Sequence, residues 1–207
     1  MIPVNVLAVR YLANASPALA KGLGAPAGMP SLGLLTTDCD DATYIALDAA
    51  TKAADVQVSY GRSFYAGAAN ASTPNAGEVI GILAAATPGA VRSGMEAALS
   101  ALERLGFEET HGVPFLAHTV ASVGSFLAKE AGVSMGSAIA YLIAPPLEGM
   151  YAMDAALKAA DVKLCKLYAP PSETNFGGGL LSGSQSACNA ACEAFLQAVT
   201  EVAQRPR

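Results

Sequence analysis

The chain has 207 residues, of which 53% are hydrophobic and only 14% are charged, and it contains 44 alanines and no tryptophan. This composition is too apolar and too weakly charged for a disordered chain. The net charge of −5 argues against a nucleic-acid partner, which usually selects a basic patch. So little charge leaves little solvated surface for a monomer of this length, and we therefore expect an oligomer or an extended assembly.

Neither a membrane nor an oxidising compartment is expected. The apolar stretches, such as residues 79–86 and 138–144, are far shorter than the ~20 residues that a membrane-spanning helix needs. The start of the chain lacks the basic and apolar regions of a signal peptide. The four cysteines are unevenly spaced, which fits a reducing cytosol better than a disulfide framework.

The first half of the chain predicts alternating strands and helices. Ser16 and Pro17 are typical of a helix start, with serine as N-cap and proline at the first helical position. In chain order we expect a strand over 4–9, a helix from Ser16 to Gly22 or Gly24, a strand over 31–37, a helix over 42–54, a strand or strand pair over 56–65, a loop over 66–76, a strand over 79–83, and a helix from Thr87 to about Leu105.

The chain also repeats itself. Residues 46–56 reappear as residues 152–162, with nine of eleven positions identical. Weaker matches on either side occur in the same order and at nearly the same offset. Such self-similarity indicates a tandem architecture. We therefore expect two α/β units of similar size, joined near Gly106 to Gly112.

The two copies differ most at one turn. Aligned on the shared helix, Asp38-Cys-Asp-Asp41 stands opposite Ala144-Pro-Pro-Leu147. One interpretation is that Asp40 or Asp41 caps the following helix. The other is that three clustered carboxylates favour a cation, which could be a metal or an organic ammonium.

The same turn also allows an enzymatic alternative. The apolar strand that leads into Asp38-x-Asp40 is close to the nucleophile motif of haloacid-dehalogenase-type, Mg-dependent phosphohydrolases. However, the fifth position of that motif is Ala42, and an internal duplication has no role in that fold.

Two loops rich in small residues correspond in place but not in sequence. They are residues 66–77 and 169–179, and each follows a Tyr-Ala pair. The triple glycine at 177–179 lacks the Gly-Lys-Ser/Thr ending of a P-loop. Because glycine and small polar residues allow a loop to rearrange, we interpret both segments as pore or gate loops.

Several motifs carry a family resemblance. The sequence resembles the L-type shell proteins of the bacterial ethanolamine-utilization microcompartment, from about Ser31 to the C-terminus. The matching segments are Ser31-Leu-Gly-Leu-Leu, Asp40-Asp-Ala-Thr-Tyr-Ile-Ala-Leu-Asp, Tyr60-Gly-Arg-Ser-Phe-Tyr-Ala-Gly, Thr73-Pro-Asn-Ala-Gly-Glu, Phe115-Leu-Ala-His, Ala140-Tyr-Leu-Ile-Ala-Pro-Pro-Leu-Glu, Pro170-Pro-Ser-Glu-Thr-Asn and Gly183-Ser-Gln-Ser-Ala-Cys.

The resemblance implies an α/β (α+β) fold of two tandem, circularly permuted microcompartment domains, over residues 1–108 and 109–207. Such a chain forms a flat homotrimer that imitates a hexamer and tiles with neighbouring shell proteins. It would be a structural protein in the shell of a microcompartment in the bacterial cytoplasm, and not an enzyme. No cofactor is required, although the resemblance leaves room for a cobalamin docking at the pore.

The resemblance also implies two kinds of pore. A small pore between the two domains of each chain would bind ethanolamine, and the matching positions are Asp40, Asp41, Glu78 and Phe107. A central pore would be gated by two loops, with the matching positions Tyr65, Gly67, Asn70, Ser72, Thr73, Pro74, Asn75, Pro171, Ser172, Glu173, Thr174, Asn175, Phe176 and Gly177. We expect no catalytic residue and no metal site.

Overall fold

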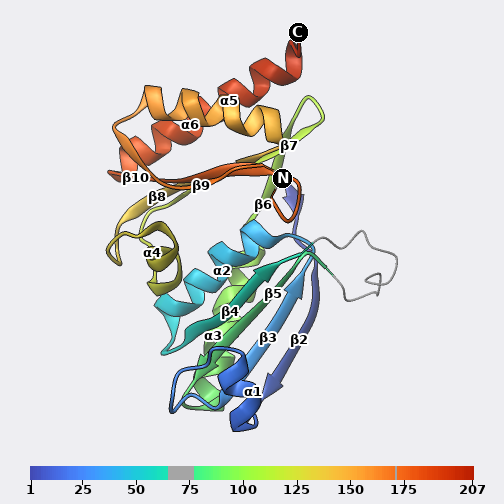
Figure 1. Ribbon diagram of the computed structural model, residues 1–207, viewed down its shortest axis with the longest axis vertical. Coiled ribbons are helices and arrows are strands. Elements are labelled where there is room, and N and C mark those ends of the chain that lie inside the picture. Colours follow the sequence, from blue (N-terminus) through green and yellow to red (C-terminus); the bar gives the residue numbers. More distant parts are fainter. Residues whose placement is uncertain (65–76, 171) are drawn as a thin grey trace. The chain divides into compact units, whose positions relative to one another are not determined.

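The computed structural model of the chain describes residues 1–64, 77–170 and 172–207. These residues fall into two compact units (Figure 1). The N-terminal unit comprises residues 3–106 and 124–126, and the C-terminal unit comprises residues 1–2, 107–123 and 127–207. Along the chain, the main change of unit lies between Gly106 and Phe107, close to the expected domain limit at 108 and 109.

The N-terminal unit is an antiparallel sheet covered by helices. Its strands are ordered β2-β3-β5-β4. Helices α2 and α3 lie side by side along one face of this sheet (Figure 1). The elements in chain order are β2 (Val6–Leu12), α1 (Pro17–Gly22), β3 (Ser31–Thr37), α2 (Asp40–Ala53), β4 (Gln57–Ser63), β5 (Val79–Ala85) and α3 (Pro88–Leu102).

The C-terminal unit repeats this plan. Its sheet contains the order β7-β8-β10-β9, which matches β2-β3-β5-β4, and α5 and α6 cover one face as α2 and α3 do (Figure 1). The expected duplication is therefore confirmed as a duplicated fold. The further elements are β1 (Ile2–Pro3), β6 (Gly106–Thr110), β7 (Val113–Val120), α4 (Ser125–Ala131), β8 (Ala138–Ala144), α5 (Pro146–Ala159), β9 (Val162–Tyr168), β10 (Gly177–Gly183) and α6 (Gln185–Gln204).

Local signals explain where the helices begin. The hydroxyl of Ser16 accepts from the amide of Leu19 at 3.3 Å, as expected for the N-cap of α1. Thr87 caps α3 in the same way, through the amide of Ala90 at 3.2 Å. Ser184 does so for α6. In α1 and α3 a proline follows the cap, where its missing N–H costs no helical hydrogen bond.

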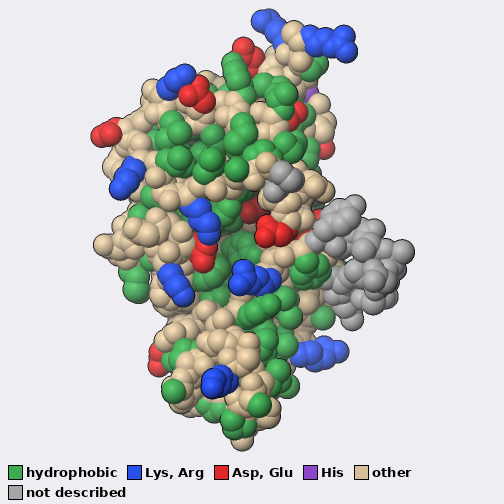
Figure 2. Space-filling model, viewed as in Figure 1, with side chains coloured by type: hydrophobic (Ala, Val, Ile, Leu, Met, Phe, Trp, Pro, Cys, Tyr) green, Lys and Arg blue, Asp and Glu red, His purple; other side chains and the backbone are tan. Residues whose placement is uncertain are grey.

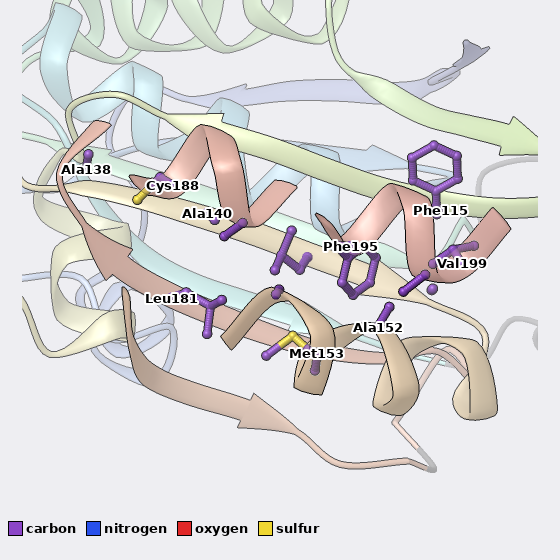
Figure 3. Packing of buried hydrophobic residues seen from close by; sticks show 14 residues of the cluster. Phe115, Ala138, Ala140, Ala152, Met153, Leu181, Cys188, Phe195 and Val199 are labelled. Atoms are coloured by element: carbon purple, nitrogen blue, oxygen red, sulfur yellow. The ribbon is translucent and has the colours of Figure 1, made fainter. Parts of the chain in front are cut away.

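The core of each unit lies between its sheet and its helices. In the C-terminal unit, Phe195 and Val199 of α6, Met153 of α5 and Leu181 of β10 gather in one apolar cluster (Figure 3). Alanines such as Ala152 separate these larger side chains, which lets the helices approach the sheet closely. The high alanine content of the sequence therefore serves close packing.

The segment expected as a linker between the units is instead a hairpin. Strands β6 and β7 pair antiparallel, with Thr110 opposite Val113. The two residues between them, His111 and Gly112, have φ of 49° and 81°. Positive φ at both central positions is the geometry of a tight hairpin turn whose twist suits the flanking strands. Sequence reasoning missed this turn because His-Gly is not one of its usual residue pairs.

Apolar side chains remain exposed on the C-terminal unit. Leu147 and Tyr151 of α5 are 67% and 49% exposed, and Leu164 and Leu167 of β9 are 39% and 49% exposed. Figure 2 shows hydrophobic side chains gathered on the surface of this unit. Among the described residues, no helix is both long and apolar enough to cross a bilayer. Exposed patches of this kind mark interaction surfaces.

Candidate functional site

The acidic turn lies between the end of β3 and the start of α2. Cys39 occupies the N-cap position and its side chain makes no cap hydrogen bond, so the interpretation that Asp40 or Asp41 is the cap residue is wrong. Instead, the buried hydroxyls of Thr37 and Thr43 lie 2.7 Å apart, and both donate to the carbonyl of Cys39. The turn is thus held by threonine, which leaves its carboxylates for other contacts.

Asp40 and Asp41 are the first two residues of α2. They are only 7% and 6% exposed. The carboxylate of Asp40 accepts from the amide of Asp41 at 2.9 Å and from the side chain of Ser63. Burial raises the pKa of Asp40, and these hydrogen bonds oppose that rise because they favour the charged form.

Glu78 is brought to the same corner of the N-terminal unit by the start of β5. Its amide donates to the carbonyl of Thr37 at 2.8 Å, and its carbonyl accepts from the amide of Phe64 at 2.9 Å. Gly77, with a φ of 62°, allows this approach, because a Cβ there would collide with the carbonyl of Thr37. Asp40 and Glu78, which are separated by 38 positions in the sequence, therefore lie at the same corner of the N-terminal unit.

The proximity of Asp40 and Glu78 affects the pKa of Glu78. Burial, followed by the negative charges of Asp40 and Asp38, raises the pKa of Glu78 to about 6. Asp38 is exposed, and both of its carboxylate oxygens accept from Asn5, at 2.7 and 2.6 Å. Burial also raises the pKa of the Cys39 thiol, so this cysteine stays protonated.

The arrangement suits an organic cation better than a metal ion. At neutral pH two neighbouring carboxylates, on Asp40 and Glu78, concentrate negative charge where water is partly excluded, which strengthens attraction to a positive group. Within the described part of the chain, no group of three or more His, Cys, Asp or Glu side chains is placed to hold a metal. An organic ammonium, which needs charge and hydrogen-bond acceptors, fits this chemistry.

The fourth expected ligand residue, Phe107, belongs to the C-terminal unit. Its ring packs edge-on against Phe176, with ring centroids 5.3 Å apart. Phe176 directly precedes β10, as Glu78 directly precedes β5. The corner that is acidic in one unit is therefore aromatic in the other.

The two expected gate loops are described to different extents. In the second loop, Ser172 closes a turn, because its backbone carbonyl accepts from the amide of Asn175 at 3.3 Å and its hydroxyl accepts from the amide of Phe176 at 3.2 Å. Glu173 is exposed on this turn, Thr174 is half-buried, and Gly177 begins β10. The remaining expected gate positions lie outside the described residues: Tyr65, Gly67, Asn70, Ser72, Thr73, Pro74, Asn75 and Pro171.

Two hydroxyl side chains beside Asp40 escaped the sequence reasoning. They are Ser63, at the end of β4, and Tyr44, one turn into α2, whose oxygens lie 2.6 Å apart. Both stand inside segments that carry the family resemblance, but nothing in their spacing marks them. The replacement of Tyr44 by Met150 at the equivalent position of the second copy was the available signal.

Comparison with known proteins places this fold in a family. A family profile described as "BMC domain" matches residues 31–115. Over 210 aligned residues the chain is 57% identical to the bacterial microcompartment shell protein EutL of Clostridium perfringens (strain 13 / Type A), covering 100% of this chain and 97% of that protein. It is 47% identical to the shell protein EutL of Escherichia coli (strain K12), covering 100% of this chain and 96% of that protein.

A solved structure agrees with these alignments. The crystal structure of the ethanolamine utilization protein EutL from Leptotrichia buccalis C-1013-b superposes with a TM-score of 0.95 at 56% identity, covering 99% of this chain and 96% of that one. These similarities give no support to the phosphohydrolase alternative. Because both the sequence and the duplicated fold match over nearly their full lengths, the chain belongs to the EutL family of bacterial microcompartment shell proteins, built from two tandem permuted microcompartment domains.

Proposed function

We propose that this shell protein of the ethanolamine-utilization microcompartment forms a trimer that imitates a hexamer and tiles with its neighbours into a facet. Two units of the same strand order in one chain supply the repeated shape, so three chains supply six such units. The exposed apolar residues of α5 and β9 supply surface that an assembly would cover. The role proposed is structural, without enzymatic activity.

The assembly is tested by mass and by shape. Sedimentation analysis is expected to give a particle of three times the 20.8 kDa of the chain. Electron microscopy at high concentration is expected to show flat, hexagonally ordered sheets. A compact monomer at all concentrations would contradict the proposal.

We further propose that the corner formed by Asp40, Asp41 and Glu78 binds the ammonium group of ethanolamine on its way through the shell. The observation that carries this step is the shared position of two carboxylates, the buried one of Asp40 and the half-buried one of Glu78, whose pKa is raised by burial and then by the charges of Asp40 and Asp38. A bound cation would relieve the repulsion between the two carboxylates.

Calorimetric titration with ethanolamine tests this site. Asp40→Asn and Glu78→Gln are each expected to weaken binding roughly tenfold, since each removes a charge-assisted hydrogen bond. Glu96→Gln, a change at an exposed carboxylate of α3, serves as the matched control and is expected to leave binding unchanged. Equal affinity in all the proteins would count against the site.

The central pore belongs to the same proposal. Its gate would consist of residues 65–75 and 171–177, and the family resemblance together with the paired position of the loops supports it. The proposed trimer needs no cofactor. Cobalamin docking would fall on these same loops, of which residues 65–76 and 171 lie outside the described residues.

A further inference from the structure

The hydroxyl groups of Tyr44 and Ser63 in the N-terminal unit form a hydrogen-bonded chain, the hydroxyl chain, that ends at the carboxylate of Asp40. The oxygens of Tyr44 and Ser63 lie 2.6 Å apart, and the side chain of Ser63 hydrogen-bonds to the carboxylate of Asp40. An ionised carboxylate can only accept hydrogen bonds. Ser63 must therefore donate to Asp40, and Tyr44 must donate to Ser63.

This direction matters because Asp40 is almost fully buried. Burial by itself favours the neutral form of a carboxylic acid and so raises its pKa. The hydrogen bond from Ser63 is the largest contribution in the opposite direction. Among the described residues, the titratable side chains around Asp40 are Cys39 and Asp41 on its own turn and Glu78 ahead of β5, all of which are acids. Asp41 also hydrogen-bonds to this carboxylate, but Ser63 at the end of the hydroxyl chain contributes more to its charged form.

Packing around the ring of Tyr44 holds the hydroxyl chain in place. The ring of Tyr44 packs against Phe126, with ring centroids 5.8 Å apart. Gly61 of β4 also lies against the ring, since a Cβ there would come within 3.3 Å of it. Because Tyr44 is confined in this way, its hydroxyl stays directed at Ser63.

Phe126 is itself anchored in the N-terminal unit. The amide of Gly124 donates to the carboxylate of Asp48 at 2.7 Å, and the amide of Ser125 donates to the hydroxyl of Thr51 at 3.1 Å. Both acceptors lie on α2, the helix that also carries Tyr44. The support therefore extends over two successive turns of one helix.

The second copy lacks the entire arrangement. At the offset of the shared helix, Tyr44 corresponds to Met150 and Asp40 to Pro146. The last residue of β4, Ser63, corresponds to Tyr168, the last residue of β9. The hydroxyl chain and the acid it serves therefore occur together in one copy and are missing together from the other.

We infer that Ser63 and Tyr44 are positioning residues that keep Asp40 charged and oriented for a small organic ammonium ligand. The inference rests on the proposed function, since it concerns the same acidic corner. It adds two residues that do not carry the ligand-binding charge themselves. Their effect on ligand binding is exerted through Asp40.

The test combines a titration with a binding profile. In Ser63→Ala, the pKa of Asp40, followed by carboxylate NMR, is expected to rise by about one unit. Ethanolamine affinity is expected to fall by up to tenfold, and by more at pH 6 than at pH 8, where the carboxylate ionises more readily even without its partner. Tyr44→Phe is expected to move both quantities in the same direction by a smaller amount, and Ser63→Thr is expected to restore them.

Ser59→Ala is the matched control, because Ser59 lies on β4 and its hydroxyl donates to the carbonyl of Ile82 at 3.4 Å. It is expected to leave both readouts unchanged. An unmoved titration of Asp40 in Ser63→Ala, or in Tyr44→Phe should the serine variant not fold, would overturn the inference. A wild-type protein that binds no ethanolamine would contradict the proposed function, and the titration would still decide whether the hydroxyl chain controls Asp40.

Discussion

Glu78 is a half-buried carboxylate with two acidic neighbours, and the free energy of unfolding should register this. Its pKa in the folded chain, about 6, lies above the ordinary value of 4.5. The folded state therefore holds this proton more tightly than the unfolded state does. The stability that Glu78 contributes is present at low pH and is lost as the pH rises through about 6.

Removing this charge should therefore stabilise the protein above pH 6. We expect Glu78→Gln to raise the free energy of unfolding at pH 8 by about 1 kcal/mol or less, because solvent screens a half-buried group. At pH 4, below the ordinary pKa of 4.5, the difference should nearly vanish. Urea denaturation at the two pH values measures it, with Glu96→Gln as the control. A stabilisation of equal size at both pH values would contradict this account.

Residue-scale prediction from sequence was partial at this corner. Asp40 and Asp41 could be singled out because an acidic turn stands in only one copy, whereas Glu78 was indicated only by the family resemblance. Ser63 and Tyr44 could not, because serine and tyrosine occur throughout such a sequence. Only the return of β4 past α2 brings their hydroxyls to Asp40.

Among the elements, the two copies of the shared helix behave differently. Asp48 and Asp154 occupy equivalent positions, and each has a lysine four residues later. Asp154 is 65% exposed and pairs with Lys158 at 2.6 Å. Asp48 is fully buried and accepts from the amide of Gly124 at 2.7 Å. The same Asp-Lys spacing thus gives an ordinary surface pair in one copy and part of a buried anchor in the other.

This difference gives a matched pair of variants. Asp48→Ala should lower the free energy of unfolding by about 1.5–3 kcal/mol, because it leaves the buried amide of Gly124 without its acceptor. Asp154→Ala should lower it by less than about 0.5 kcal/mol, as is usual for an exposed helical pair. Chemical denaturation of both variants measures the two costs. Similar losses in the two variants would show that Asp48 does not act as an anchor.

At the scale of the whole molecule, the exposed leucines of β9 should matter for assembly. Within the described residues, β9 is an edge strand that pairs with β10 alone. β9 carries Lys163 and Lys166, which charge this edge, but its exposed leucines leave apolar surface that proteins normally cover. In the proposed trimer, such a surface would be covered by another chain.

Leu167→Glu should therefore shift the trimer towards monomers while leaving the circular dichroism spectrum unchanged, since a charge buried in an interface without a partner is costly. Sedimentation velocity over a range of concentrations measures the shift. Lys163→Gln, a polar-for-polar change on the same strand, is the control and should leave the trimer intact. A trimer that survives Leu167→Glu would place β9 outside the assembly contacts.

The sequence by itself determined the duplication, the order of the elements in the first half of the chain and the copy that carries the acids. These features depend on local patterns and on self-similarity, which are visible without coordinates. The tertiary structure alone decided that Asp40 and Glu78 share a corner, and that Asp48 is buried while Asp154 is exposed. Nine of eleven residues are identical around those two aspartates, so local sequence cannot separate them. Burial and hydrogen bonding depend on segments far along the chain, here residues 124–126, which approach only one of the two helices.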